Sequence, residues 1–147
     1  QAAVGIAQID KLDFIVEKNR LNKHLVKSNI DRSDKIKFRD IVDVKGDLAD
    51  TLIFNFEEKK YCDNFLKQYL SAGYSTKNLP DAYDWHFAGT WKHMFKNDKK
   101  YQFNWHTCWD KSADLLSRSI SIPILVNTSE NESLKHANDI NLILKSI

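Results

Sequence analysis

The residues best suited to bind a ligand gather in one irregular stretch, from Tyr74 to His93. The stretch follows a hydrophobic run that ends at Leu70 and is punctuated by Gly73. It has no period of two or of 3.6 residues, and it holds two Trp, two Tyr and two His. Such side chains need partners for their polar ends, so they are awkward to bury and costly to expose. The stretch is therefore expected to bind a ligand or, alternatively, to fill a small satellite core beneath a long loop.

Other chemistry has weaker support in the sequence. A metal site would have to combine His86, His93, His106 and Cys108, whose spacing matches no closed zinc pattern. A cysteine nucleophile at Cys108 beside His106 has no further supporting residue. The four glycines are isolated, which excludes a nucleophile elbow, a Walker loop and a dinucleotide fingerprint. No metal site and no catalytic residue is therefore predicted within this chain.

Composition places the chain among ordinary globular proteins. Its 147 residues suit one domain, and 42% hydrophobic with 29% charged residues is usual for such a domain. The net charge of +2 and the scattered basic residues disfavour nucleic acid as a partner, although the Trp and Tyr side chains offer stacking surfaces. No apolar run is long enough for a membrane span. The two cysteines lie far apart, so a reducing cytoplasm is expected.

Hydrophobic periodicity then predicts the elements that must position the aromatic stretch. The apolar spacing of residues 1–29 indicates one long helix with Ile6, Ile9, Leu12 and Val16 in its stripe. Alternation and turn residues predict a strand over 36–44, a turn at Gly46-Asp47 and a strand over 51–56. Residues 57–72 predict a helix with Tyr61, Phe65, Leu66, Tyr69 and Leu70 on its apolar side and Gly73 as its left-handed cap.

The second half predicts shorter elements. These are a short strand at 74–77, a helical turn within 91–103, a second aromatic cluster at 105–109, a short helix at 112–116 and an edge strand over 120–126 that contains Pro123. A final helix is expected to be capped by Thr128, with a buried stripe of Leu134, Ala137, Ile140, Ile143 or Leu144, and Ile147. The order predicts an α+β fold, in which a small antiparallel or mixed sheet has helices packed on one face.

The chain is expected to be a piece of a longer protein. It begins Gln1-Ala2-Ala3 without Met, within the predicted first helix, and it has only four Gly and two Pro. We expect the missing part to precede Gln1. Residues 1–29 would then form a helix long enough to connect two domains, and residues 36–147 would form the body of the second domain.

Three segments resemble one known family, the DegT/DnrJ/StrS-type sugar aminotransferases. The start resembles the helix that follows the catalytic half of that family: Gln1-Ala2-Ala3-Val4-Gly5-Ile6-Ala7-Gln8-Ile9-Asp10-Lys11-Leu12. The end resembles its last strand and closing helix: Leu116-Ser117-Arg118-Ser119-Ile120-Ser121-Ile122-Pro123, then Thr128-Ser129-Glu130. Between them, Asp84-Trp85-His86 and Trp91-Lys92-His93 look like the subgroup that makes 8-amino-3,8-dideoxy-octulosonate, an amino sugar acid of lipopolysaccharide.

This resemblance implies a fold-type I enzyme dependent on pyridoxal phosphate. Such enzymes move an amino group, usually from glutamate, to a keto-sugar, and they usually form homodimers. The family's catalytic lysine precedes a Gly-Glu-Gly-Gly turn that this sequence does not contain. Residues 1–147 would therefore be the small C-terminal domain, which is not catalytic alone and is not expected to bind the cofactor by itself.

By the same resemblance, a loop of this domain closes the active site over the sugar. The substrate-binding candidates are Lys77, Asn78, Trp85, His86 and Trp91. His86 would hydrogen-bond a sugar hydroxyl or carboxylate and Trp85 would stack on the sugar, unless these side chains merely pack the loop onto the sheet. Arg118 lies in the strand segment that resembles the family, and it is as consistent with a structural salt bridge as with a role in the site. Two alternatives stay open: a standalone carbohydrate-recognition or protein-interaction module, and a fragment of a related sugar dehydratase in which histidine replaces the lysine.

Overall fold

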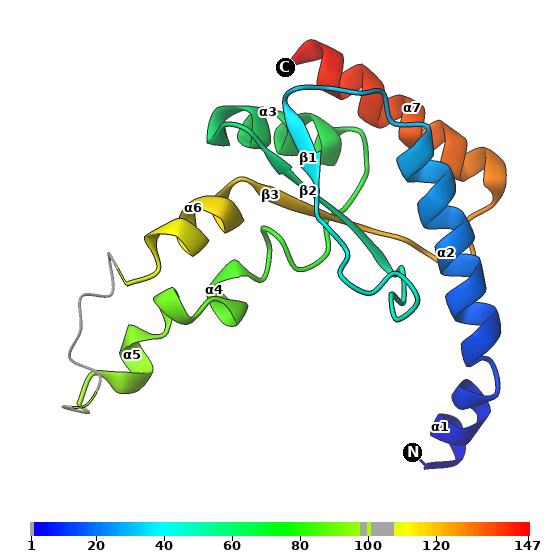
Figure 1. The fold of residues 1–147 in the computed structure, drawn as a ribbon, viewed down its shortest axis with the longest axis horizontal. Coiled ribbons are helices and arrows are strands. Elements are labelled where there is room, and N and C mark those ends of the chain that lie inside the picture. The colour runs from blue at the N-terminus through cyan, green and yellow to red at the C-terminus, as the bar shows by residue number, and fades with distance from the viewer. Residues whose placement is uncertain (1, 98–99, 101–107) are drawn as a thin grey trace.

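A computed structural model of the protein describes residues 2–97, 100 and 108–147, and Figure 1 shows its fold. A three-stranded antiparallel sheet has the order β1-β2-β3. Its strands are β1 (Ile36–Phe38), β2 (Thr51–Phe56) and β3 (Ser119–Pro123). In β2 the side chains alternate between buried and half-buried, as a strand with two unequal faces requires. The predicted α+β class is confirmed.

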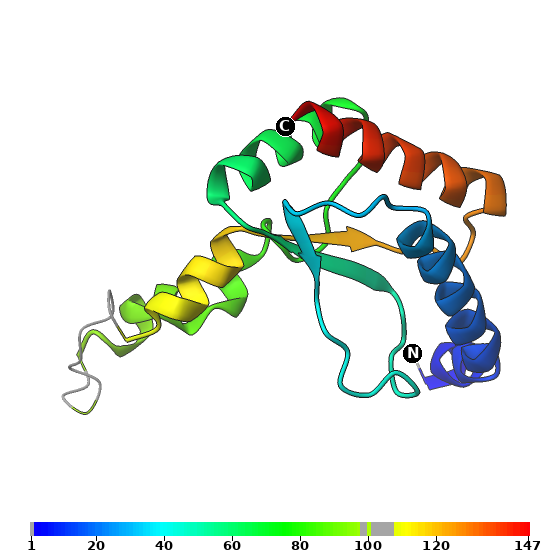
Figure 2. The ribbon, with the colours of Figure 1, turned by 45° about the horizontal axis from the view of Figure 1, so that its top comes forward.

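Helices cover the inner face of the sheet, where Leu52, Phe54 and Phe56 of β2 are buried. Figure 2 shows α3 (Lys59–Ser71) and α7 (Glu130–Ser146) above the sheet and α2 (Leu12–Ser28) at its side. The Phe54 ring meets the Phe65 ring of α3 edge to face, at 5.5 Å between centroids. Ile140 of α7 is fully buried in the same core. The core therefore lies between the sheet and these helices, and it leaves the outer sheet face to the remaining segments.

The predicted single helix over residues 1–29 is wrong in one respect, because it is divided. The helix α1 (Ala2–Ile9) ends and α2 begins at Leu12. At the break the Lys11 N–H donates to the Gln8 carbonyl at 3.1 Å, a tighter i to i−3 bond than the α-helical ladder uses. No residue of α1 is buried, and its Ile6 and Ile9 are 64% and 69% exposed. Tertiary contacts therefore fix α2 and not α1.

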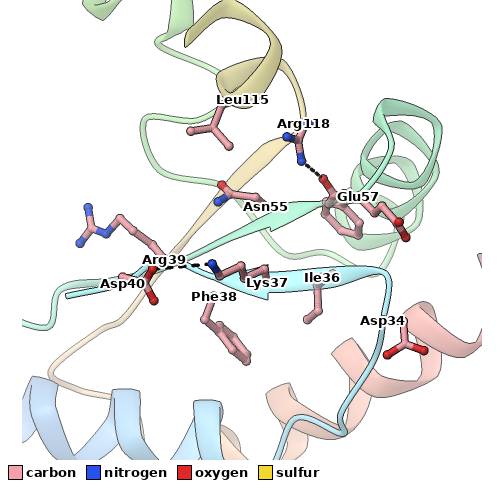
Figure 3. Close-up of a pocket in the computed structure, with 11 residues that line it drawn as sticks. Asp34, Ile36, Lys37, Phe38, Arg39, Asp40, Asn55, Glu57, Leu115 and Arg118 are labelled. Atoms are coloured by element: carbon pink, nitrogen blue, oxygen red, sulfur yellow. Dashed lines mark hydrogen bonds and ion pairs between the residues drawn. The ribbon is translucent and has the colours of Figure 1, made fainter. Parts of the chain in front are cut away.

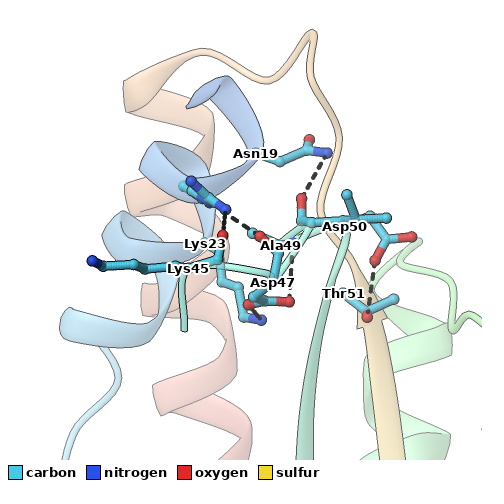
Figure 4. A network of polar contacts seen from close by, with 9 residues as sticks. Asn19, Lys23, Lys45, Asp47, Ala49, Asp50 and Thr51 are labelled. Atoms are coloured by element: carbon cyan, nitrogen blue, oxygen red, sulfur yellow. Dashed lines mark hydrogen bonds and ion pairs between the residues drawn. The ribbon is translucent and has the colours of Figure 1, made fainter. Parts of the chain in front are cut away.

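The predicted strand over residues 36–44 is also too long. The strand β1 ends at Phe38, and the ladder continues only as far as the Arg39 N–H, which donates to the Ile53 carbonyl at 2.9 Å. Beyond it, Val42 and Val44 are 103% and 71% exposed. Figure 4 shows polar side chains of α2 bound to the connection that follows.

These α2 contacts anchor the connection between β1 and β2. Lys23, itself buried, forms an ion pair with Asp47 at 2.6 Å. The Asn19 amide donates to the Leu48 carbonyl at 3.4 Å, and the Arg20 guanidinium donates to the carbonyls of Lys45 and Asp47. These contacts hold the connection against α2.

The last helix, α7, begins one residue later than predicted. Ser129, not Thr128, is its N-cap, and Ser129 and Glu132 form a capping box. The predicted stripe of α7 is confirmed as buried or half-buried. On α3 the predicted apolar side is correct except for Leu70, which is 48% exposed in the last turn. Gly73 has a φ of 87°, so its predicted left-handed conformation is confirmed.

The remaining segments are short helices along the outer side of the sheet. The helix α6 (Asp110–Ser117) confirms the helix predicted at 112–116 and extends it. The predicted helical turn after Trp91 corresponds to α5 (Lys92–Phe95). Residues 98, 99 and 101–103 of that range lie outside the described residues, as do Trp105, His106 and Thr107 of the second aromatic cluster. In the described part of the chain no helix has the length and apolar character needed to cross a bilayer. The other short elements are α4 (Tyr83–His86), η1 (Ala88–Thr90) and α5 (Lys92–Phe95).

Candidate functional site

A tight turn at residues 77–79 takes the place of the predicted strand at 74–77. The Leu79 N–H donates to the Lys77 carbonyl at 2.9 Å, which closes a γ-turn around Asn78 at a φ of 70°. The turn fits against β3, because the Lys77 N–H donates to the Ser121 carbonyl at 2.8 Å and the Ser121 N–H donates to the Leu79 carbonyl at 3.2 Å. Both backbone groups of Ser121 are thereby paired, and Asn78 is held beside the sheet.

An ion pair fastens this turn a second time. Lys77 Nζ lies 2.6 Å from Asp50 Oδ2 at the start of β2, with the two side chains 40% and 47% exposed. The hydrogen bond from Lys77 is the main reason that the pKa of Asp50 is lowered below its usual value. Lys77, which resemblance makes a substrate-binding candidate, thus has its amine engaged with a carboxylate of its own chain.

A cavity of about 330 Å³ lies against the outer sheet face, next to the turn. Ile53 of β2 and Leu116 of α6 supply part of its apolar wall. Three of its lining residues carry polar groups: the Asn78 amide, the Tyr83 hydroxyl and the His86 imidazole. The complete lining consists of Ile53, Asn78, Leu79, Tyr83, His86, Phe87 and Leu116, which we call the turn pocket.

The polar ends in the turn pocket are available to a ligand. The side chains of Asn78, Tyr83 and His86 make no hydrogen bond to another residue in the described part of the chain. Partial burial raises the pKa of Tyr83, with a further contribution from the nearby charge of Asp84, so this hydroxyl stays protonated and can donate. An apolar cavity with a few unengaged polar groups is the usual form of a small-molecule site.

The two tryptophan candidates lie elsewhere. Trp85 is 81% exposed, and the Trp91 indole N–H donates to the Trp85 carbonyl at 3.2 Å. Both line a second, open hollow of about 520 Å³ together with Asp84, His93 and Met94. The structure therefore brings Asn78 and His86 together in the turn pocket and Trp85 and Trp91 together in the second hollow, whereas Lys77 lines neither cavity.

A third hollow, of about 630 Å³, lies further along the outer sheet face (Figure 3). Lys37, Arg39 and Asn55 enter it from β1, the residue after β1, and β2. Sequence reasoning did not select these residues, although the alternation of Lys37 and Arg39 with Ile36 and Phe38 was the signal that could have placed them on the outer face. Arg118 lines the same hollow, but it donates to the Phe56 carbonyl and to Asp114 at 3.1 Å, which is the structural role considered for it.

Sequence reasoning also missed a cluster on the helix side, which anchors the start of the aromatic stretch. The rings of Tyr69, Tyr74 and His136 are stacked, with Tyr74 and His136 centroids 4.4 Å apart. The Tyr69 hydroxyl lies 2.7 Å from His136 Nε2, and Tyr74 donates to Asp139. Burial raises the pKa of Tyr69 and lowers that of His136, so both are neutral at neutral pH. Because Tyr74 opens the stretch, this cluster fixes where it leaves the core.

The metal site considered from His86, His93, His106 and Cys108 has no counterpart among the residues that the structure describes. In those residues no three His, Cys, Asp or Glu side chains converge as metal ligands. His106 lies outside the described residues. His86 and His93 line different cavities.

The chain is thus an α+β domain with a cavity on the outer face of its sheet. No model of a known protein family matches the sequence. Two solved structures of Spr1654 from Streptococcus pneumoniae, described as a sugar aminotransferase, do match. The PMP form aligns with a TM-score of 0.71 and 14% sequence identity, and the apo form aligns with a TM-score of 0.71 and 15% sequence identity. The aminotransferase TlmJ from Streptoalloteichus hindustanus aligns with a TM-score of 0.66 and 12% identity.

These alignments cover 99% of this chain but only 34% to 36% of the matched chains. The chain therefore has the fold of one part of a sugar aminotransferase, and it spans about a third of the length of these structures. At such low identities the likeness concerns the fold and not the chemistry of individual residues.

Proposed function

We propose that the chain is the small C-terminal domain of a sugar aminotransferase dependent on pyridoxal phosphate, and that the turn pocket receives the keto-sugar. The observation that carries this proposal is the turn pocket itself: three unengaged polar groups around an apolar cavity, on a fold shared with sugar aminotransferases. Sugars present apolar ring faces and hydroxyl edges, which such a cavity matches. Glutamate is the proposed amino donor.

The cofactor does not fit the turn pocket. A covalent attachment needs a lysine amine in the cavity, and no lysine lines the turn pocket. The amine nearest in sequence, that of Lys77, is paired with Asp50 at 2.6 Å. The cofactor would therefore be attached to another part of the enzyme. This chain would bind and orient the sugar, with residues 1–29 connecting it to that part.

Each site residue has a proposed role within this arrangement. His86 and Asn78 hydrogen-bond sugar hydroxyls in the turn pocket, and Tyr83 donates from its wall. Trp85 stacks on the sugar or on a partner surface from the adjoining hollow, and Trp91 fixes the Trp85 backbone through its indole N–H. The finer proposal is that the sugar is the octulosonate precursor of lipopolysaccharide, in a cytoplasmic homodimer.

One observation favours a second candidate, a standalone carbohydrate-recognition module. The turn pocket forms from residues of this chain, as a standalone module would require. The upstream reading frame separates the two: a lysine followed by Gly-Glu-Gly-Gly supports the aminotransferase, and a histidine in place of that lysine supports the related dehydratase. A start codon immediately before Gln1 would refute both and leave the module.

A kinetic experiment on the intact gene product tests the site. We expect His86→Ala to lower kcat/KM for the keto-sugar by about 10-fold, since a lost hydrogen bond to a bound ligand costs roughly 1–3 kcal/mol. The amino sugar and the 2-oxoglutarate formed from glutamate are both measured. His24→Ala, on an exposed residue of α2, is the matched control. A change within about twofold for His86→Ala, equal to the control, would remove His86 from the site.

Asn78 needs a different substitution. Its φ of 70° favours glycine, so Asn78→Gly deletes the amide without straining the turn, whereas Asn78→Ala adds strain. We expect Asn78→Gly to raise KM for the sugar while the free energy of unfolding stays the same or increases. An unchanged KM would exclude the Asn78 amide as a sugar ligand.

A further inference from the structure

A further hollow, of about 470 Å³, lies on the helix side of the sheet and shares no lining residue with the turn pocket. Its walls come from the end of α3, from residues 73–75, from the end of β3 with the loop after it, and from the first turns of α7. Tyr69, Tyr74 and His136 give it an aromatic lining, and Pro123 and Leu125 give it an apolar one. Leu125 is 61% exposed, so the described part of the chain leaves this lining open to a ligand. We call this hollow the stack pocket.

The three rings of the stack pocket are nearly parallel. The Tyr74 centroid lies 4.9 Å from that of Tyr69 and 4.4 Å from that of His136, at interplanar angles of 16° and 11°. The Tyr69 and His136 rings are 5.8 Å apart at 20°, joined by the hydrogen bond between the Tyr69 hydroxyl and His136 Nε2. Near-parallel rings at such distances attract one another, and a further flat ring packed on them gains the same attraction. The stack pocket therefore favours a planar aromatic ligand over a saturated one of equal size.

The hydrogen bond between Tyr69 and His136 determines which imidazole nitrogen carries a proton. Tyr69 is fully buried, and His136 Nε2, at 2.7 Å, is the only acceptor for its hydroxyl among the described residues. A buried hydroxyl that donates to no acceptor is costly, so Tyr69 donates and Nε2 accepts. The neutral His136 ring then carries its hydrogen on Nδ1, for which the described residues provide no partner. The half-buried His136 thus adds an unengaged N–H donor to the lining.

The charged residues of the stack pocket are already paired. Glu132 Oε2 accepts from the Ser129 N–H and hydroxyl at 2.8 and 2.6 Å, and Lys135 Nζ lies 2.7 Å from Asp139 Oδ2. The pocket thus has one charge of each sign, each with a partner within the chain, so neither sign of ligand charge is favoured. The lining residues whose side chains make no hydrogen bond in the described part of the chain are neutral: Ser75, Asn127 and Thr128. An uncharged ligand therefore matches this lining best.

We propose that the stack pocket binds a small, neutral aromatic compound that carries a hydrogen-bond acceptor, such as an aromatic amide. Its ring packs on the Tyr74 and His136 rings and against Leu125, and its carbonyl accepts from His136 Nδ1–H. This ligand is distinct from the sugar of the proposed function, because no residue of the turn pocket takes part. The inference therefore stands or fails independently of the sugar site.

Titration of the 147-residue chain with four matched probes tests the ligand class, followed through the backbone nitrogen–proton resonances of Tyr74, Ser75 and Asn127. Benzamide is neutral and planar and carries a carbonyl. Benzoate and benzamidine have the same shape with a negative and a positive charge, and cyclohexanecarboxamide has the same amide on a saturated ring. We expect benzamide to shift these resonances saturably with a Kd about 5-fold lower than that of each other probe, because the saturated ring loses the stacking and the charged probes lose hydration without gaining a partner. The absence of a saturable shift with benzamide, or an equal or lower Kd for another probe, overturns the inference.

Two pairs of variants locate the binding. Tyr74→Phe keeps the ring and should leave the Kd of benzamide unchanged, whereas Tyr74→Leu removes the ring and should raise the Kd about 5-fold. Leu125→Ser removes apolar contact and should raise the Kd by a similar factor, whereas Leu142→Ser, at a 65% exposed leucine of α7 that does not line the pocket, should not change it. Because both leucines are exposed, this second pair keeps the fold intact even if Tyr74→Leu does not. If Leu125→Ser and Leu142→Ser bind benzamide alike, the inference is overturned.

The imidazole nitrogen resonances of His136 test the hydrogen bond. In the free chain at neutral pH, Nδ1 should be the protonated nitrogen, and benzamide should shift the Nδ1 resonance more than the Nε2 resonance. A proton on Nε2 instead would remove the donor from the stack pocket and overturn the inference.

Discussion

Lys77 either positions the turn through its ion pair with Asp50 or binds the substrate directly, and the strength of the ion pair tests which. Lys77→Met removes the amine and keeps most of the aliphatic stem. The two charged atoms are 2.6 Å apart, but the side chains are 40% and 47% exposed, so water screens their attraction. We therefore expect a coupling free energy of about 0.2–1 kcal/mol, the range for partly exposed pairs. A larger value would require burial that this pair does not have.

A double-mutant cycle measures this coupling. Urea denaturation gives the free energy of unfolding of the unmodified chain, of Lys77→Met, of Asp50→Asn and of the double variant. The pair lowers the pKa of Asp50 in the folded state, so its contribution is present above the unfolded pKa and is lost as the pH falls through the lower, folded pKa. The coupling should also decrease in about 1 M salt, where the Debye length is about 3 Å.

The matched control is the ion pair between Lys59 and Asp63 on α3, which has the same 2.6 Å separation at 60% and 57% exposure. Its disruption should change stability by a similar or smaller amount and leave sugar binding unchanged, because it lies on a helix outside the site. The tether interpretation is refuted if the Lys77 and Asp50 cycle shows no coupling while Lys77→Met weakens sugar binding about 10-fold or more. Lys77 would then contact the sugar directly, as the resemblance implies.

Three further predictions concern the body of the domain. Burial lowers the pKa of His136 below its ordinary 6.5, so the folded state binds this proton less readily than the unfolded state. The free energy of unfolding should therefore be at its full value above about pH 6.5 and decrease as the pH falls below it. In urea denaturation, His136→Gln should reduce this dependence of the free energy of unfolding on pH. Burial raises the pKa of the Cys62 thiol to about 11, so iodoacetamide should alkylate the exposed Cys108 and spare Cys62 until the chain is unfolded, as mass spectrometry of the peptides would show. Phe54→Ala should lower the free energy of unfolding by about 3–5 kcal/mol, because Phe54 is fully buried among three aromatic rings, whereas Phe14→Ala at a 64% exposed position should change it by no more than about 0.5 kcal/mol; equal losses at the two positions would contradict the burial pattern.

Elements whose signals are local were predicted well. The strand β2 was predicted with the bounds that it has, because six residues alternate in burial and are rich in aromatic and β-branched types. The stripe of α7 and the left-handed cap at Gly73 were predicted for similar reasons, since spacing and conformational freedom act within a few residues. The α+β class followed from the order of these elements.

The misjudged boundaries depend on distant residues. β1 ends at Phe38, and Asn19, Arg20 and Lys23 of another element bind residues 45–48 of the connection that follows. Nothing within residues 36–44 indicates those contacts. The division of the first helix at Lys11 similarly separates a part that packs on the core from a part with no buried residue.

By itself the sequence determined the fold class, the strongest elements and the stretch that holds the turn pocket's polar groups, because periodicity and residue type are properties of neighbours along the chain. Only the tertiary structure decided which members of that stretch share a cavity. Asn78 and His86 meet Ile53 and Leu116 because the turn at 77–79 docks on β3, and Lys77 is drawn to Asp50 instead. Arg39 lies opposite Ile53 for a similar reason, because strand register joins residues far apart in sequence.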